Sequence, residues 1–273
     1  MQNSEKPIGI FDSGVGGLTV FKAISELLPN ENLLYLGDTA RVPYGTRSRE
    51  TIRKYTEMAA ARLTDYNIKM LVIACNTATS ASLPGLESRF PDLLVAGVIE
   101  PGAAAACAAT SRGHIGVIAT EATIRGQAYQ KAIGRILPKA TVVAKACTLL
   151  VPLAEEGWID GPIAENVAQK YLSEIFTGAD DPDTLLLGCT HFPLFRNILQ
   201  KLTGPAVRIV DSALATASLV REMLAQACLL NQSAAPGSRQ FFTTDNRERF
   251  MATGGHFLGE LMPDAGVRLI NLQ

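Results

Sequence analysis

The chain has 273 residues, of which 47% are hydrophobic and 19% are charged, and its formal net charge at pH 7 is −1. This length and composition provide a buried core for one large domain or two smaller ones, and they exclude an intrinsically disordered protein. Lysines and arginines are scattered, so no basic patch indicates a nucleic-acid partner. The most apolar stretch, residues 93–109, is interrupted by Glu100-Pro101-Gly102, so no membrane span is expected.

Short apolar runs alternate with segments of helical periodicity along the chain. The runs expected to be buried strands are residues 8–11, 33–35, 71–74, 94–98, 115–119, 141–144, 185–187 and 207–210. The segments expected to be helices are residues 18–28, 47–66, 123–137, 163–176 and 213–226. Alternating strands and helices predict an α/β fold with mostly parallel sheets and right-handed crossovers.

Two pairs of similar segments indicate that this α/β pattern is repeated. Residues 8–13 resemble residues 115–120 at an offset of 107, and the apolar run that ends at Cys75 resembles the run that ends at Cys189 at an offset of 114. We therefore expect two similar α/β domains with the active site in the cleft between them. The first would comprise residues 1–97 and 213–273, and the second residues 98–212, so that each domain carries one of these thiols.

The cysteine content predicts a reducing environment. There are five cysteines, an odd number, and none stands in a C-x-x-C pair. We therefore expect no disulfide framework, and we expect a cytoplasmic location. The short polar start of the chain leads directly into a strand, so a signal peptide is not expected either. Only three histidines are present, and Cys189 with His191 is the only close Cys/His pair, which argues against a metal site.

Cys75 and Cys189 are the strongest candidates for chemistry. Each follows a buried strand where a helix is expected to begin. A helix N-terminus favours a thiolate, so we expect a lowered pKa for the Cys75 thiol. A lone cysteine is more often an inert core residue, and Cys107, Cys147 and Cys228 are interpreted that way. Two matched thiols instead suggest one sulfur on each side of a substrate.

Polar residues near the two thiols leave several interpretations open. His191 could tune the protonation of Cys189, could satisfy a local carbonyl, or could form a Cys-His hydrolase pair that leaves Cys75 unexplained. The glycine-rich segment after Asp12 is neither a P-loop nor a G-x-G-x-x-G motif, so its amides and Ser13 are expected to hold a small anion. Asp12 could cap a helix or act as an acid/base partner of a thiol.

Five motifs in order resemble the bacterial glutamate racemases, in the Asp/Glu racemase family. They are Asp-Ser-Gly-Val-Gly-Gly from residue 12, Gly-Asp…Pro-Tyr-Gly from residue 37, Ala-Cys-Asn-Thr-Ala from residue 74, Val-Pro-Leu-Ala-Glu from residue 151 and Gly-Cys-Thr-His-Phe-Pro-Leu from residue 188. The resemblance extends from about residue 8 to residues 241–259. It implies interconversion of L- and D-glutamate without a cofactor, D-glutamate for peptidoglycan, and a homodimer. No lysine lies in these motifs, which fits an enzyme without pyridoxal phosphate.

The resemblance also implies roles for individual residues. Cys75 would remove the α-proton of D-glutamate with help from Asp12, and Cys189 that of L-glutamate with help from Glu155 and His191. Substrate contacts would come from Asp12, Ser13, Tyr44, Gly45, Asn76, Thr77, Thr120, Thr190 and His191. Residues 146–151 lack the Cys-Pro usual in the family, so Glu155 is placed by its neighbours alone. An aspartate racemase, a cysteine hydrolase and a non-catalytic amino-acid binder remain the alternatives.

Overall fold

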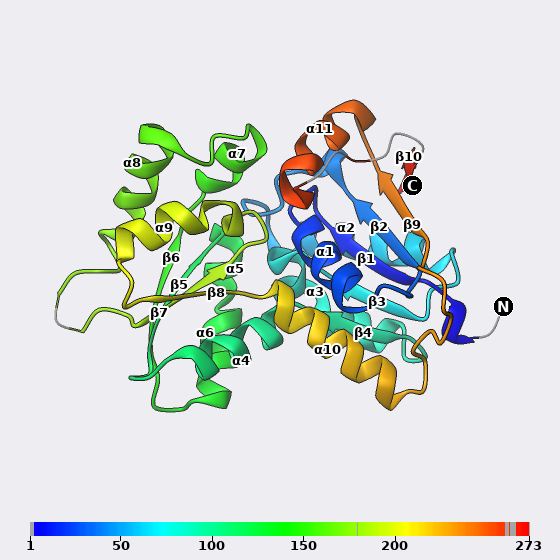
Figure 1. The fold of residues 1–273 in the computed structure, drawn as a ribbon, viewed down its shortest axis with the longest axis horizontal. Coiled ribbons are helices and arrows are strands. Elements are labelled where there is room, and N and C mark those ends of the chain that lie inside the picture. Colours follow the sequence, from blue (N-terminus) through cyan, green and yellow to red (C-terminus); the bar gives the residue numbers. More distant parts are fainter. Residues whose placement is uncertain (1–2, 179, 260–261, 263–265, 273) are drawn as a thin grey trace.

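Two parallel sheets form the framework of the protein. The computed structural model describes residues 3–178, 180–259, 262 and 266–272. The first sheet has strand order β10-β9-β2-β1-β3-β4 and the second β6-β5-β7-β8, and every pairing is parallel. Figure 1 shows the second sheet to the left of the first. The strands are β1 (Ile8–Asp12), β2 (Leu33–Gly37), β3 (Met70–Ile73), β4 (Leu94–Gly97), β5 (His114–Ala119), β6 (Thr141–Ala146), β7 (Thr184–Gly188), β8 (Arg208–Asp211), β9 (Arg239–Thr243) and β10 (Val267–Leu269).

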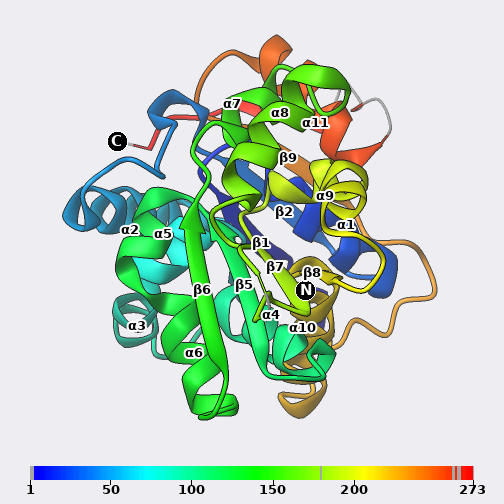
Figure 2. The ribbon, with the colours of Figure 1, turned by 90° about the vertical axis from the view of Figure 1, so that its left-hand side faces the viewer.

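Helices flank both sheets, and Figure 2 shows α5 and α6 on one side of the second sheet with α9 on the other. The α-helices are α1 (Leu18–Leu27), α2 (Arg49–Thr64), α3 (Asn76–Arg89), α4 (Ile99–Ala109), α5 (Glu121–Gly126), α6 (Ala128–Ile136), α7 (Leu150–Glu155), α8 (Gly161–Leu172), α9 (Arg196–Thr203), α10 (Ala213–Gln226) and α11 (Arg247–Leu258). Short 3₁₀-helices are η1 (Asn3–Glu5), η2 (Thr39–Arg41) and η3 (Phe192–Phe195).

The central strands are buried along their whole length, which explains why they are uninterrupted apolar runs. All residues of β1, β2, β3 and β7 are buried. Successive side chains of β7 point to opposite faces. Leu185 and Leu187 pack in the core that contains α8 and α9, and Leu186 packs in the core that contains α4 and α6. Helices on both faces of a parallel sheet therefore account for the pattern.

The predicted α/β fold is confirmed, and all eight predicted strands are present with ends within two residues of those expected. Strands β9 and β10 were not predicted. The single helix expected over residues 123–137 is wrong: it is divided into α5 and α6 at Gln127, whose φ of 53° lies in the left-handed region and cannot continue a helix.

The two sheets repeat one local topology. β1 lies between β2 and β3, and β5 lies between β6 and β7. Cys75 follows β3, and Cys189 follows β7 at the equivalent place in the second sheet. The similarity of residues 8–13 to residues 115–120 thus corresponds to two equivalent central strands.

Each sheet is built from its own part of the chain. Strands of the first sheet come from residues 8–97 and 239–269, and strands of the second from residues 114–211. After β8 the chain enters α10, which packs against α1 of the first half. We propose on this basis that the domain boundaries fall at residues 97/98 and 212/213.

Candidate active site

The carboxyl ends of β1, β3, β5 and β7 converge on one cavity of about 310 Å³. Ligand sites of parallel sheets lie at such strand ends. Eleven of the twelve residues expected at the site line this cavity, and the twelfth, Asp12, is fully buried at the end of β1. The eleven are Ser13, Tyr44, Gly45, Cys75, Asn76, Thr77, Thr120, Glu155, Cys189, Thr190 and His191.

Cys75 caps the N-terminus of α3. Its Sγ accepts a hydrogen bond from the backbone N–H of Ala78 at 3.5 Å and lies 3.4 Å from Ser13 Oγ. The expected lowering of its pKa is wrong: burial, together with the nearby Asp12 carboxylate, raises the pKa of Cys75 to about 12 and outweighs these two hydrogen bonds. Cys75 is therefore a neutral thiol in the free protein.

Cys189 has a different setting from the one expected. It is followed by a turn and the 3₁₀-helix η3 rather than directly by an α-helix. Its Sγ lies 3.8 Å from His191 Nδ1. The thiol is almost fully buried, like that of Cys75.

His191 links Cys189 to Glu155. The His191 Nε2 atom lies 3.1 Å from Glu155 Oε1, and the ring packs edge-on against Phe257 of α11. Burial alone would lower the pKa of His191, but the hydrogen bonds and charges of Cys189 and Glu155 raise it to about 10. At neutral pH His191 is therefore an imidazolium between a sulfur atom and a carboxylate. Glu155 is the last residue of α7.

Asp12 is close to the site without lining the cavity. Its Oδ2 accepts a hydrogen bond from the backbone N–H of Gly14 at 3.0 Å, and within the described part of the chain Oδ1 has no hydrogen-bond partner. Burial raises the pKa of Asp12, while the charge of His191 and the N–H of Gly14 act in the opposite direction. The carboxyl group is thus coupled electrostatically to both thiol-bearing turns.

Hydroxyl groups from both halves meet where α3 and α5 begin. Thr77 Oγ1 lies 2.8 Å from Thr120 Oγ1, and Thr123 Oγ1 lies within 3.3 Å of both. All three side chains are buried. Thr123 was not predicted, although it lies one helical turn after Thr120 and so shares its face of α5.

Glycines permit the close approach of the two halves. A Cβ on Gly16 would lie against Thr190 Oγ1 and only 2.5 Å from His191 Nδ1. A Cβ on Gly45 would lie 2.8 Å from Thr120 Cβ, and the carbonyl of Gly45 accepts a hydrogen bond from the N–H of Ala122 at 2.9 Å. Any larger residue at either position would force the halves apart.

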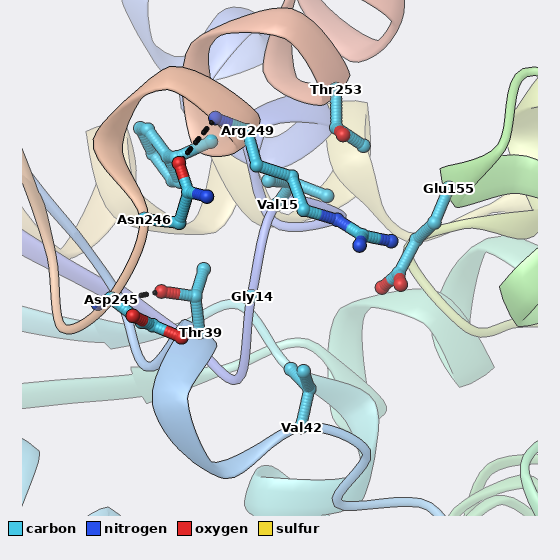
Figure 3. A pocket seen from close by; sticks show the side chains of 10 residues that line it. Gly14, Val15, Thr39, Val42, Glu155, Asp245, Asn246, Arg249 and Thr253 are labelled. Atoms are coloured by element: carbon cyan, nitrogen blue, oxygen red, sulfur yellow. Dashed lines mark hydrogen bonds between the residues drawn. The ribbon is translucent and has the colours of Figure 1, made fainter.

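A second cavity of about 260 Å³ adjoins the site on the far side of Glu155. It lies between η2, α11 and α7, and in Figure 3 the Arg249 side chain extends across it towards Glu155. The guanidinium donates a hydrogen bond to Glu156 Oε1 at 3.0 Å, so this ion pair joins α11 to the end of α7. The Glu156 side chain is 61% exposed, so this ion pair lies at the surface.

Sequence reasoning missed part of the cavity wall. Val42, Pro43, Thr46, Thr148, Val151 and Pro152 also line it. Thr46 and Thr148 lie in loops outside any motif quoted above, so only the folded structure reveals them.

All five cysteines are free thiols. Among the residues that the structure describes, no cluster of three His, Cys, Asp or Glu side chains suited to a metal ion occurs, and no helix has the length and apolarity to cross a membrane.

Comparisons with known proteins identify the family to which the chain belongs. The family model for Asp/Glu/Hydantoin racemase matches residues 8–220. The chain therefore belongs to the Asp/Glu/hydantoin racemase family and is an isomerase.

Within that family the chain groups with the glutamate racemases. The glutamate racemase of Geobacter metallireducens is 49% identical over 259 residues, which cover 95% of each chain. A crystal structure of the Francisella tularensis glutamate racemase in complex with D-glutamate superposes with a TM-score of 0.91 at 35% identity, covering 98% of both chains. A Bacillus anthracis glutamate racemase isoform superposes with a TM-score of 0.93 at 35% identity, again over 98% of both chains.

Proposed function

We propose that the protein interconverts L- and D-glutamate by a two-base reaction in which Cys75 and Cys189 exchange protons with the α-carbon. The observation that carries this proposal is the pair of buried thiols at equivalent strand ends of two similar sheets, both lining one cavity. Relatives named glutamate racemases, one of them solved with D-glutamate, support the choice of substrate.

The reaction requires proton transfer on two faces of one carbon. From L-glutamate, the Cys189 thiolate removes the α-proton, and the Cys75 thiol then donates its proton to the opposite face, which gives D-glutamate. The reverse reaction begins with a Cys75 thiolate and a Cys189 thiol. The raised pKa of Cys75 supports its role as the proton donor that converts L- to D-glutamate.

Neighbouring groups support each thiol differently. His191, held as an imidazolium by Glu155, can share a proton with Cys189 Sγ. Glu155 thereby assists Cys189 through His191. Asp12 raises the pKa of Cys75, which keeps the proton on the sulfur until the α-carbanion forms.

The cavity also supplies groups for the two carboxylates and the ammonium of glutamate. Hydroxyls and amides from both halves would position it: Ser13, Tyr44, Gly45, Asn76, Thr77, Thr120 and Thr190. The phenol of Tyr44 donates to Asp38 Oδ2 at 2.5 Å, so Tyr44 would contribute its backbone rather than its hydroxyl. Buried, fixed donors stabilise charge that develops at the carboxylate more effectively than water does.

Deuterium incorporation tests this mechanism. In D₂O, each enantiomer of glutamate should gain α-deuterium as it racemises, without any added cofactor. Cys75→Ser and Cys189→Ser should each lower turnover by about 10²–10⁴-fold, while Cys228→Ser, which changes an exposed thiol, should not.

Each alternative function predicts another result. Turnover of aspartate but not glutamate would indicate an aspartate racemase. A cysteine hydrolase would keep its activity in Cys75→Ser. A binding protein would bind glutamate without any deuterium wash-in.

We further propose a cytoplasmic homodimer that supplies D-glutamate for peptidoglycan. The names of the relatives support the product, and the five free thiols support a reducing compartment. Light scattering at several concentrations would test the dimer, and D-glutamate auxotrophy on deletion of the gene would test the cellular role.

A further inference from the structure

Tyr129 of α6 crosses from the second half of the molecule to the first. Its side chain is only 1% exposed, and its hydroxyl donates a hydrogen bond to Asn76 Oδ1 at 2.6 Å. Asn76 begins α3 directly after Cys75. A side chain of α6 therefore holds the residue next to one of the two thiols.

The ring of Tyr129 also lies against the residue that precedes the other thiol. A Cβ on Gly188 would lie 2.7 Å from Tyr129 Cε2, so the ring packs directly on the backbone before Cys189. On its other side, a Cβ on Gly102 would lie 3.1 Å from the Tyr129 hydroxyl oxygen. Gly188 and Gly102 thus confine the ring to one orientation.

Asn76 has one satisfied polar atom and one free polar atom. Oδ1 accepts from Tyr129, whereas Nδ2, in a side chain only 2% exposed, has no hydrogen-bond partner among the described residues. Asn76 lines the active-site cavity. Because a buried N–H group without a partner is costly, such a donor is best explained by a ligand acceptor in that cavity.

We propose that Tyr129 is a positioning residue for the reaction: its hydroxyl fixes the carboxamide of Asn76 so that the NH₂ group faces a carboxylate of the substrate. This inference rests on the proposed binding of glutamate in the cavity. Without the phenol, rotation of the carboxamide by half a turn would present an acceptor oxygen to the carboxylate and repel it. Burial raises the pKa of Tyr129, so the hydroxyl remains a donor at every working pH.

Tyr129→Phe removes the hydroxyl and keeps the ring that packs on Gly188. We expect KM to rise on the order of tenfold for both enantiomers, because the contact holds the carboxylate before proton transfer begins. The turnover number kcat should fall as well to the extent that this carboxylate gains negative charge in the α-carbanion. Tyr66→Phe, which alters a phenol that packs on Phe242 outside the cavity, serves as the matched control.

A double-mutant cycle identifies the residue through which Tyr129 acts. In an Asn76→Ala background, Tyr129→Phe should have no further effect on KM, or on the dissociation constant of glutamate from an NMR titration where turnover is too slow. An unchanged tenfold effect in that background would overturn the proposal, as would a lowered kcat with KM unchanged. The proposed function is tested separately, because absence of deuterium wash-in with the unsubstituted enzyme would refute glutamate racemisation itself.

Discussion

The charge state of His191 is the property of the site most open to direct measurement. Its pKa is raised from 6.5 to about 10, and at ~1.36 kcal/mol per pKa unit this is roughly 5 kcal/mol in favour of the imidazolium. Two partners, Cys189 and Glu155, share that stabilisation. Because burial lowers the pKa, the combined effect of the two partners is larger than this net rise. Glu155→Gln keeps a hydrogen-bond acceptor and removes the charge, so with equal shares for the two partners more than half of the net rise should be lost and the pKa of His191 should fall towards its ordinary 6.5.

NMR of the imidazole C–H groups over a pH series measures this directly. The chain has only three histidines, and the signals of His114 and His256 serve as internal references. Glu156→Gln is the matched control, because Glu156 is exposed and pairs with Arg249. Titration of His191 at or below pH 6.5 in the unsubstituted protein would show that burial outweighs its two partners, and equal effects of both substitutions would rule out a specific role for Glu155.

The same pKa makes a prediction about stability. Because the folded-state pKa of His191 lies above its ordinary value, its contribution to the free energy of unfolding is fully present below about pH 6.5 and is lost as pH rises through about 10. Glu155→Gln should therefore destabilise the protein at neutral pH and leave it nearly unchanged at high pH. Chemical denaturation at the two pH values checks this.

Three further substitutions test other parts of the structure. Gly16→Ala should abolish most turnover in a folded protein, since its Cβ would lie 2.5 Å from His191 Nδ1 and displace the ring; full activity would contradict this. Lys69→Met should lower the free energy of unfolding by about 3–5 kcal/mol, because it leaves the buried carboxylate of Glu31, now 2.5 Å from the lysine, without its charged partner. Adding Glu31→Leu should recover much of this loss, as measured by denaturant titration. Burial alone would raise the pKa of Asp183, but hydrogen bonds from an adjoining turn lower it below its ordinary 3.8. Its contribution is thus present above that pH and lost on acidification, so Asp183→Asn and the unsubstituted protein should differ in melting temperature at neutral pH and converge in acid.

Strand pattern made most of the fold predictable. Each of the strands β1 to β8 contains an uninterrupted apolar run, as is typical of parallel sheets, so these eight could be recognised, and the paired Cys motifs indicated two halves. β9 contains Arg239 and Gln240 beside two phenylalanines, and β10 has three residues with two exposed, so neither has a distinctive pattern. The break at Gln127 was hidden because apolar spacing continues across it and only the backbone conformation reveals it.

Site residues could be predicted where a strand end carries a sequence motif. Residues that join the site through contacts between distant elements could not. Thr148 lines the cavity and Tyr129 contacts Asn76 through packing between elements, for which a single sequence has no signal. The spacing of Thr123 from Thr120 was a weak signal, because it shows a shared helix face but not what that face contacts. The predicted lowering of the Cys75 pKa was wrong for a physical reason. The helix N-terminus suggested a thiolate. The free energy of ionising the thiol, however, depends on its burial and on the nearby Asp12 carboxylate, and neither can be read from the local sequence.

The two thiols match in position and differ in surroundings, and mirror-image chemistry limits how that difference can be observed. L- and D-glutamate have equal free energies in water, so kcat/KM must be the same in both directions at every pH. D-glutamate reacts with the form of the enzyme in which Cys75 is a thiolate. This form is the minor one, because the pKa of the Cys75 thiol is about 12. Most bound D-glutamate then lies in an unreactive complex, which lowers kcat and KM together relative to L-glutamate. Initial rates with each enantiomer test this: equal kcat values would show that the surroundings of the thiols are balanced in the complex, and unequal kcat/KM would be incompatible with simple racemisation.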